Sequence, residues 1–382
     1  MDETKHESVI YDDIGPEMIV EVYDPKLKYH GRLVIDNTNL GMGKGGIRMT
    51  PTVTTVEVSR LARAMTYKNA LAGLPFGGAK AGITADPRSF GAAHKKAIME
   101  SFARALRPLI PSRYIAGPDI NTTEKDMQIF AQAHGEWESA TGKPATFTSK
   151  KGGKTRRGLP HELGSTGYGV ALSAIVAAES KGLNIKDATV SISGYGNVGT
   201  FVHKFLQEKG AKIIAVADSS GTVYKRDGLD YHQLMAVKAK TGSVGNYPGA
   251  KKLTRDVLYE LTTDILIPAA GPDAIHEGNV GKVKATIIVE GANISIKDGL
   301  ENTLHKKGIL VIPGIIANAG GVISSYAEYK GYDAKKMFKL IEEKIVPNMK
   351  EVLAVVGRGN LSPNQAALKI ARQRVLNASV KK

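Results

Sequence analysis

Short apolar runs alternate with one-sided helical patterns in the second half of the chain. DATVSIS (187–193) and AKIIAVAD (211–218) predict two strands, and the second is apolar almost throughout, as a parallel strand covered on both faces requires. Between them the apolar residues recur at spacings of three and four, which predicts a helix; they are Val198, Phe201, Val202, Phe205 and Leu206. Gly210 is placed to end this helix.

Three more short apolar runs follow, and glycine and small polar residues come after each of them. The runs are DILIP (264–268), ATIIVE (285–290) and GILVIP (308–313). This pattern predicts an open α/β sheet whose strands end at ligand-sized turns. A helix over 319–330 and amphipathic segments up to residue 382 complete this half.

The first half also mixes strands and helices. Residues 17–36 predict two strands around a turn, 54–72 and 90–107 predict helices, and 113–120 predict a short strand that ends at a turn. The helix over 54–72 leads into a glycine-rich run, GLPFGGAKAG.

Two local signals mark where elements begin and end in this half. Thr123 and Asp126 have the spacing of a capping box at the start of the helix EKDMQIFAQAH. Residues 141–165 are rich in Gly, Lys and Thr and have few apolar positions, so we expect a loop and hinge there.

Composition narrows the functional classes. A chain of 382 residues fits two domains. It has no cysteine, which excludes disulfides and thiolate nucleophiles, and its nine histidines lack the pairing of a zinc site, so no metal is expected. No apolar run reaches the roughly 20 residues that span a bilayer, and the N-terminus lacks a signal-peptide core. We therefore expect a cytoplasmic protein without a membrane partner.

The net charge of +15 favours anionic ligands, which include nucleotides, dicarboxylates and nucleic acid. The densest basic cluster is SKKGGKTRRG (149–158), and it contains no aromatic residue on which a base could stack. Charge runs are usually solvated. We expect a solvated basic loop, with an anion contact as the alternative, and nucleic acid as an unlikely partner.

The turn GYGNVG lies between a predicted strand and a predicted helix, which is the setting of a dinucleotide fingerprint. Gly194 permits the tight turn, Gly196 lets the backbone approach a pyrophosphate, and Gly199 lets helix and strand pack closely. The pyrophosphate would then sit at the helix N-terminus, where unpaired N–H groups favour negative charge.

The residues after the second strand bear on the choice between NAD and NADP. Asp218 is placed to accept hydrogen bonds from ribose hydroxyls, which favours NAD. Ser219, Ser220, Lys225 and Arg226 are instead suited to a 2′-phosphate. Both coenzymes stay open.

Three lysines in the first half lie in ligand-like settings. Lys44 lies in GMGKGGIRM, Lys68 in MTYKNA and Lys80 in FGGAKAG. Around Lys44 and Lys80, small residues leave the backbone open to a ligand and give the lysine stems no apolar surface to cover. Asp119 ends an apolar strand, and Thr123 already serves as the helix cap, so Asp119 is available for chemistry.

Together these motifs resemble the glutamate/leucine/phenylalanine/valine dehydrogenase superfamily of amino-acid dehydrogenases. GKGGIRM, MTYKNALAGLPFGGAKAG, GPDINTTEKDM, GYGNVG, EGANIS and NAGGVISSY occur in the family's order between about residues 30 and 330. The resemblance implies reversible oxidative deamination, in which an L-amino acid, water and NAD(P)⁺ give a 2-oxo acid, ammonium and NAD(P)H.

The resemblance also implies roles for the first-half residues. Lys80 matches the lysine that polarises the carbonyl and activates water, Asp119 the general acid/base at the nitrogen, and Lys68 the residue that holds the α-carboxylate. A Lys80 with no permanent partner, near Lys68, would have a lowered pKa. Moving that pKa from about 10.4 to about 8 needs on the order of 3 kcal/mol.

Lys44 and Ser325 match the residues that bind the substrate's side-chain carboxylate in the glutamate branch. The leucine and phenylalanine branch usually has an apolar residue at the lysine position. Burying an unpaired charge costs several kcal/mol, so Lys44 favours L-glutamate and 2-oxoglutarate. The alternatives are a leucine/valine-type dehydrogenase and a non-catalytic nucleic-acid-binding relative.

The resemblance completes the expected architecture. We predict an α/β fold with a substrate-binding and oligomerisation domain (1–160, with 340–382 returning to it) and a Rossmann-type domain (161–339), separated by a cleft. A homo-oligomer, most often a hexamer, is implied. The residues expected at the coenzyme are Gly194, Gly196, Asn197, Val198, Gly199, Asp218, Ser219, Thr166, Asn293 and Asn318.

Overall fold

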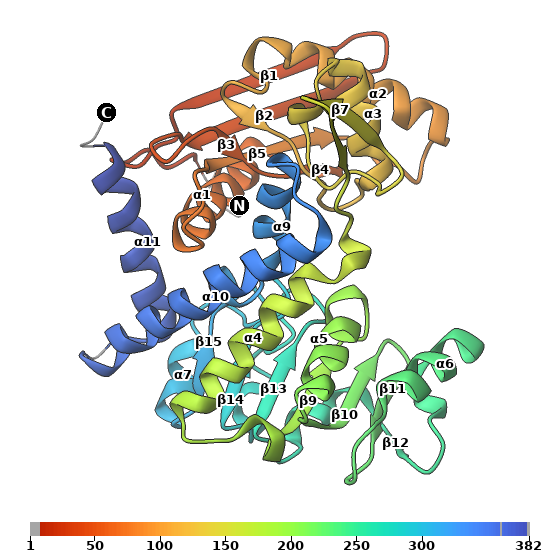
Figure 1. Ribbon diagram of the computed structural model, residues 1–382, viewed down its shortest axis with the longest axis vertical. Coiled ribbons are helices and arrows are strands. Elements are labelled where there is room, and N and C mark those ends of the chain that lie inside the picture. Colours follow the sequence, from red (N-terminus) through yellow and green to blue (C-terminus); the bar gives the residue numbers. More distant parts are fainter. Residues whose placement is uncertain (1–7, 360, 380–382) are drawn as a thin grey trace, which may run out of the picture. The chain divides into compact units, whose positions relative to one another are not determined.

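The computed structural model describes residues 8–359 and 361–379 (Figure 1). It divides the chain into two compact units. The first contains the described residues up to Pro160, Val322–Met337 and the described residues from Ile370 onward; the second contains His161–Gly321 and Phe338–Lys369. The chain therefore returns to the first unit at Val322, and most of the expected returning segment, up to Lys369, belongs to the second unit.

The first unit is built on a six-stranded mixed sheet in the order β1-β2-β5-β3-β6, with β4 paired to β5. Strand β2 is antiparallel to β1 and β5, whereas β3 and β4 are parallel to β5. The strands are β1 (Met18–Asp24), β2 (Tyr29–Asn37), β3 (Gly43–Lys44), β4 (Ile47–Thr50), β5 (Gly77–Thr84) and β6 (Tyr114–Ile115). The predicted strands at 17–36 and 113–120 are confirmed.

The helices of the first unit begin where local capping predicts them. In α1 (Thr55–Leu71) the Thr54 side chain accepts the Glu57 N–H, and α2 (Ala92–Ala105) follows. In α3 (Glu124–His134) the predicted capping box is present, because Thr123 and Asp126 bond to each other's backbone N–H groups. Caps of this kind satisfy N–H groups that have no partner inside the helix.

The glycine-rich run forms a buried strand rather than an open, ligand-lined turn. A Cβ on Gly78 would lie 2.0 Å from the Thr66 hydroxyl of α1, and one on Gly77 would lie 1.9 Å from the Asn37 carbonyl oxygen. These glycines therefore allow α1 and β2 to pack directly onto β5. The expectation that they open the backbone to a ligand is wrong at these two positions.

Residues 141–165 contain a β-hairpin where a loop was predicted. Strands β7 (Thr148–Lys151) and β8 (Lys154–Arg157) pair antiparallel across a Gly-Gly turn, and both turn glycines have positive φ (57° and 74°). Two-residue hairpins favour such turns because their twist matches that of the strands. Lys151 and Arg156 both pair with Glu138, so part of the basic cluster is neutralised.

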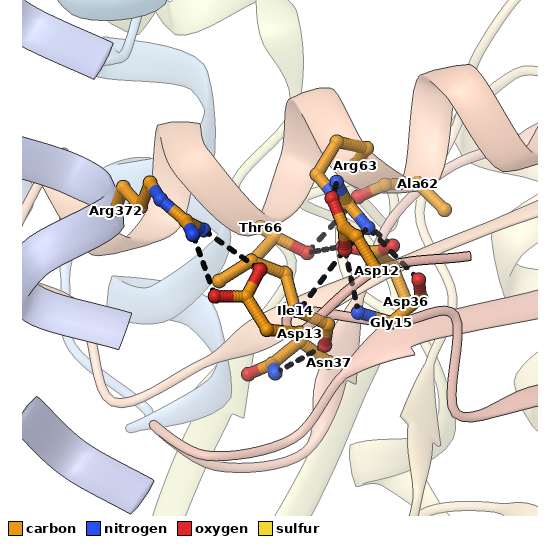
Figure 2. A network of polar contacts seen from close by, with 10 residues as sticks. All are labelled: Asp12, Asp13, Ile14, Gly15, Asp36, Asn37, Ala62, Arg63, Thr66 and Arg372. Carbon is orange, nitrogen blue, oxygen red and sulfur yellow. Dashed lines mark hydrogen bonds and ion pairs between the residues drawn. The ribbon is translucent and has the colours of Figure 1, made fainter. Parts of the chain in front are cut away.

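The N-terminal segment is tied to the first unit by the polar network in Figure 2. Arg63 of α1 donates to both oxygens of buried Asp36 (3.0 and 2.9 Å) and to both oxygens of Asp12 (2.8 Å each). Thr66 adds a hydrogen bond to Asp36, and Arg372 pairs with Asp13. One arginine thus links β2, α1 and the N-terminal segment.

The second unit has a seven-stranded sheet in the order β12-β11-β10-β9-β13-β14-β15. Five neighbouring strands, β10, β9, β13, β14 and β15, are parallel, as predicted. Strands β11 and β12 extend the sheet beyond β10 as antiparallel strands, which the apolar pattern did not indicate. The strands are β9 (Thr189–Ser193), β10 (Lys212–Asp218), β11 (Gly221–Tyr224), β12 (Lys251–Leu253), β13 (Ile265–Pro268), β14 (Ile287–Val289) and β15 (Leu310–Ile312).

The strand order reverses beside β9, because the chain passes from β9 to β10 on one side and later returns to β13 on the other. Open parallel sheets bind ligands at this kind of switch point. The remaining helices are α4 (Ser165–Ser180), α5 (Asn197–Glu208), α6 (Tyr231–Thr241), α7 (Glu301–Lys306), α8 (Gly314–Ala317), α9 (Gly320–Tyr329), α10 (Ala334–Gly357) and α11 (Pro363–Ser379).

Candidate active site

Lys80 and Asp119 form an ion pair in the first unit. Lys80 is in the middle of β5, opposite Val34 of β2, and its Nζ lies 3.0 Å from Oδ2 of Asp119. The two side chains are only 8% and 19% exposed. The expectation that Lys80 lacks a permanent partner is therefore wrong, because β5 carries the ammonium group to the turn that follows β6.

Asp119 is held by the backbone around it. Its N–H donates to the Thr122 hydroxyl (2.8 Å), which in turn donates to the Ile47 carbonyl of β4 (2.7 Å). A Cβ on Gly46 would lie 2.6 Å from the Pro118 carbonyl oxygen and 2.9 Å from Asp119 Cβ. Glycine at position 46 therefore lets this turn approach β4 closely.

Arg48 of β4 is a further partner of Asp119 that the sequence patterns did not single out. Its Nε lies 2.9 Å from Asp119 Oδ2, and its Nη1 lies 2.6 Å from Glu57 Oε1 on α1. Asp119 thus accepts from two cations at the same oxygen. In the sequence, Arg48 could have been noticed only because it lies in the motif GKGGIRM, four residues after Lys44. The motif does not show that the Arg48 side chain reaches Asp119, because that depends on how β4 pairs in the sheet.

The electrostatics of the pair follow from burial and these neighbours. Burial lowers the pKa of Lys80, Asp119 opposes this effect, and Arg48 adds to it. The expected direction of the Lys80 shift is therefore confirmed, with Arg48 as the neighbouring cation where Lys68 was expected. Burial raises the pKa of Asp119, but Lys80 and Arg48 outweigh it, so that pKa lies below its usual range.

Lys44 is a buried cation at the end of β3. Its side chain is 3% exposed, and its Nζ donates to the Ala116 carbonyl (3.0 Å). Burial lowers the pKa of Lys44 to about 7, while the Glu328 carboxylate opposes the shift and the Lys80 and Lys143 charges add to it. The ammonium group also approaches Gly117, where a Cβ would lie 2.7 Å from Nζ.

The other two first-unit candidates are half-buried. Lys68 lies in the last turn of α1, the helix that packs on β5, and Ser325 lies in α9. All five expected catalytic and substrate-binding residues therefore belong to the first unit, although Ser325 is more than 200 positions after the others in the chain.

The fingerprint glycines of the second unit differ in their surroundings. Gly194 has φ +97°, and a Cβ there would lie 2.5 Å from the Ala270 backbone. A Cβ on Gly199 would lie 2.0 Å from the Gly194 carbonyl oxygen, whereas one on Gly196 would meet nothing within 4 Å. Gly196 precedes α5, so its open side adjoins the helix N-terminus. This arrangement fits a pyrophosphate at that end of the helix.

Asp218 ends β10 and is bonded to the neighbouring turn. Its oxygens accept from the Ser220 N–H and hydroxyl (2.9 and 2.6 Å) and from the Val244 N–H (2.8 Å). Burial opposes its ionisation, but these hydrogen bonds hold the pKa of Asp218 below its usual range. Ser219, the next residue, is exposed.

The cations near Asp218 differ from those expected. The hairpin register pairs Asp218 with Gly221 and places Lys225 beside Ile214, so Lys225 and Arg226 lie at the other end of β10. The suggestion that they contact a 2′-phosphate beside Asp218 is therefore wrong.

Lys238 of α6 is the cation that the fold brings there instead. Its Nζ donates to the Tyr195 carbonyl in the glycine turn, and its charge helps to lower the pKa of Asp218. The sequence gives no signal for Lys238, because 20 residues and a hairpin separate it from Asp218.

The remaining coenzyme candidates are brought near one another within the second unit. Asn318 donates to the Asn293 side chain (3.2 Å) and to the Gly291 carbonyl (3.4 Å). Thr166 lies at the start of α4, and its hydroxyl would lie 2.9 Å from a Cβ on Gly321. The start of α4 therefore packs on the start of α9, which follows Asn318 by two residues.

The described part of the chain offers neither a metal centre nor a membrane-spanning helix. Within residues 8–359 and 361–379, no three His, Asp or Glu side chains gather closely enough to hold a metal ion. In the same residues, no helix combines the length and the apolar character that crossing a membrane would need.

Two family models match separate parts of this chain. A family model described as Glu/Leu/Phe/Val dehydrogenase, dimerisation domain matches residues 17–135. A second, described as Glutamate/Leucine/Phenylalanine/Valine dehydrogenase, matches residues 158–382. The stretch 136–157, which contains the basic hairpin, lies outside both matches.

Individual proteins similar to this chain in sequence or fold are named as glutamate dehydrogenases. The chain is 38% identical to a glutamate dehydrogenase of Aeropyrum pernix, over 90% of this chain and 84% of that protein. It is 41% identical to an NADP-specific glutamate dehydrogenase of Saccharolobus shibatae, over 82% and 75%. The fold resembles a hetero-hexameric glutamate dehydrogenase of Thermus thermophilus with a TM-score of 0.83 and 27% identity, over 96% of this chain and 90% of the other.

Proposed function

Because this chain belongs to the glutamate/leucine/phenylalanine/valine dehydrogenase family, we propose that it catalyses the reversible oxidative deamination of L-glutamate. L-Glutamate, water and NAD(P)⁺ give 2-oxoglutarate, ammonium, NAD(P)H and a proton. The observation that supports this most is a buried Lys80–Asp119 pair in the same unit as a second buried cation, Lys44. Buried, perturbed charges of this kind are concentrated at functional sites.

Lys80 is proposed to act at the substrate's α-carbon. As an ammonium ion it donates a hydrogen bond to the 2-oxo group and draws electron density from the carbonyl carbon. As a neutral amine it accepts a proton from the water that attacks that carbon. Because burial lowers the pKa of Lys80, its ammonium group loses a proton more easily than that of an exposed lysine.

Asp119 is proposed to move the proton at the substrate nitrogen. A general base must be ionised before it can accept a proton, and Lys80 and Arg48 keep this carboxylate ionised. Because Asp119 and Lys80 form an ion pair, a proton accepted by one group changes the charge beside the other.

The substrate's two carboxylates need separate cations. We propose that Lys68 holds the α-carboxylate and that Lys44 and Ser325 hold the distal one. A buried ammonium group whose bonded partner is a carbonyl oxygen has no full counter-charge in that contact, and a carboxylate supplies one. An aliphatic side chain would leave the Lys44 charge uncompensated.

The second unit is proposed to hold NAD(P), which supplies the hydride acceptor or donor when bound. The N–H groups at the start of α5, with Asn197 and Val198, would contact the pyrophosphate, and Asp218 and Ser219 the adenosine ribose. Thr166, Asn293 and Asn318 would contact the nicotinamide half. The relatives include proteins named for NADP as well as some named without a coenzyme. Asp218 suits the ribose hydroxyls of NAD, whereas the nearby Lys238 suits the 2′-phosphate of NADP, so either coenzyme fits the proposal.

Assembly is proposed to be homo-oligomeric and hexameric. The model matching residues 17–135 is described as a dimerisation domain, which supports contacts between copies of this chain. The Thermus thermophilus structure is named as a hetero-hexamer, which supports the number of subunits.

The two alternatives have weaker support. A leucine/valine-type enzyme would have to bury Lys44 without a counter-charge from its substrate. A non-catalytic nucleic-acid binder would rest on the basic hairpin, and there Lys151 and Arg156 already pair with Glu138.

One assay tests the proposed function. Loss of NADH or NADPH absorbance is followed with ammonium and either 2-oxoglutarate or 2-oxoisocaproate. We expect fast oxidation with 2-oxoglutarate alone. Faster turnover of 2-oxoisocaproate would establish the leucine-type alternative, and no turnover of either acid with either coenzyme would overturn the enzymatic proposal.

A further inference from the structure

Glu328 of α9 is a fully buried carboxylate with both oxygens engaged. Its Oε1 lies 2.6 Å from Lys143 Nζ, and both side chains are 0% exposed. Its Oε2 accepts from the backbone N–H groups of Gly142 (2.9 Å) and Leu159 (2.8 Å). The carboxylate therefore fixes α9 to both ends of the segment that carries the hairpin. The sequence patterns single out neither Glu328 nor Lys143.

The same segment contacts the group that holds Lys44. The Ala116 carbonyl accepts from Lys44 Nζ (3.0 Å) and from the Thr141 N–H (3.0 Å). Thr141 immediately precedes Gly142, whose N–H is bonded to Glu328. A short series of hydrogen bonds thus joins Lys44 to Glu328 through two successive residues.

The charges that act on Lys44 come from three parts of the first unit. Glu328 on α9 favours its protonated form, whereas Lys80 on β5 and Lys143 on the segment after α3 disfavour it. Lys80 already has Asp119 as its partner. With Lys44 protonated, the buried cluster of Lys44, Lys143 and Glu328 therefore carries two positive charges and one negative charge.

We propose that Glu328, held in place by Lys143, is a positioning residue that favours the protonated form of Lys44 and aims it at the distal carboxylate of the substrate. The cluster's remaining charge of +1 is balanced by a substrate whose side chain ends in a carboxylate, and an aliphatic side chain leaves it unbalanced. This inference rests on the proposed function, because it names the charges that select the substrate class of the same site.

The pairing has a measurable consequence for protons. Burial brings the pKa of Lys44 to about 7, against the effect of Glu328. A carboxylate bound beside Lys44 stabilises the ammonium ion and raises that pKa. Well above pH 7, dicarboxylate binding therefore takes up close to one proton, and well below pH 7 it takes up none.

Calorimetric titration with glutarate measures this uptake without turnover, when it is repeated in buffers of different ionisation enthalpy. Glu328→Gln retains an acceptor oxygen and removes the negative charge, so the uptake profile should move to lower pH. Glutarate affinity at pH 8 should fall about tenfold for each unit by which the Lys44 pKa drops. In the assay, the KM for 2-oxoglutarate should rise while kcat stays within about threefold.

Lys143→Gln is the matched control. It removes a cation that disfavours the Lys44 ammonium ion, so its uptake profile should move to higher pH. Both substitutions disrupt the same buried pair, and loosening of the fold would shift both profiles in one direction. Shifts in the same direction, or an unchanged profile in Glu328→Gln, would overturn the proposal.

Two wild-type results complete the test. Absence of proton uptake above pH 7 would overturn the proposal even if neither variant folds. Glutarate binding with proton uptake but no turnover of 2-oxoglutarate would instead overturn the proposed function and leave this inference standing.

Discussion

The Nζ of Lys80 and the Oδ2 of Asp119 lie 3.0 Å apart, and this contact sets the resting charge of both proposed catalytic groups. Asp119 resists the loss of charge that burial would impose on Lys80, and Lys80 does the same for Asp119. Arg48 shares the same carboxylate oxygen. When substrate enters, a proton gained or lost by either group therefore changes the pKa of the other.

Lys80→Ala should abolish turnover and leave the coenzyme site intact. General acid/base contributions are typically 10²–10⁴-fold, so we expect a loss of at least about 1,000-fold in kcat. The fingerprint glycines belong to the other unit, so NADPH and NADH binding followed by fluorescence should be unchanged. Near-normal activity would contradict the role given to Lys80.

Asp119→Asn should reduce kcat by about 100-fold or more without unfolding the protein. Removing this charge also removes the main opposition to the lowered pKa of Lys80, so the Lys80 pKa should fall further. The pH–rate profile should then shift to lower pH on the limb that reports Lys80. A changed KM with an unchanged kcat would count against proton transfer by Asp119.

Lys44→Leu should change substrate preference. The substitution removes the buried charge and supplies apolar surface, so the ratio of kcat/KM for 2-oxoisocaproate over 2-oxoglutarate should rise by about 100-fold or more. Lys96→Leu, at an exposed position on α2, is a control for the loss of one positive charge. If Lys44→Leu keeps the wild-type ratio, the distal carboxylate is bound elsewhere.

Two glycine substitutions should separate folding from coenzyme binding. A Cβ at position 199 would lie 2.0 Å from the Gly194 carbonyl oxygen, so Gly199→Ala should lower the melting temperature. A Cβ at position 196 meets no protein atom, so Gly196→Ala should melt normally and bind NAD(P)H more weakly. Unchanged coenzyme affinity in Gly196→Ala would argue against a pyrophosphate there.

Arg63→Ala should lower the free energy of unfolding by about 3 kcal/mol, because it leaves the Asp36 carboxylate buried without its ion-pair partner. Arg63→Lys, which keeps the charge and loses the fork that reaches Asp12 and Asp36 together, should cost less. Urea unfolding measures both variants. Equal stability of Arg63→Ala and wild type would show that the network in Figure 2 is not stabilising.

The same network should respond to acid. Arg63 lowers the pKa of Asp12 to about 2, from an ordinary value near 3.8. The stabilisation from this pair is therefore fully present above about pH 4 and is lost as pH falls through 2. In wild type the unfolding midpoint should decline over this range, and in Asp12→Asn that part of the decline should be absent.

Local sequence predicted the elements that have a clear periodic signal and missed others, several of which depend on strand pairing. The capping box at Thr123 and the apolar face of α5 use neighbours within one or two turns, and both are confirmed. The β7–β8 hairpin was missed because its residues are polar on both faces, which leaves no periodic signal. The β11–β12 extension was missed because the two strands have only four and three residues, too few for a clear alternating pattern.

The sequence also could not assign the purpose of the glycines around Lys80. Gly77 and Gly78 are adjacent to a lysine, and adjacency suggested an open site. In the fold, α1 and β2 pack so closely against these two positions that only glycine fits there. A missing Cβ has the same appearance in a sequence whether a ligand or another part of the chain occupies the space.

By itself the sequence determined the α/β class, the order of the strands and helices that have a clear periodic signal, the family and the candidate lysines, because each depends on local periodicity or on motifs of adjacent residues. Only the tertiary structure decided that Lys80 meets Asp119, that Arg48 joins them, that Lys238 takes the place expected of Lys225, and that Glu328 is joined to Lys44. Ion pairs act over a few ångströms, and the fold alone determines which distant residues come that close.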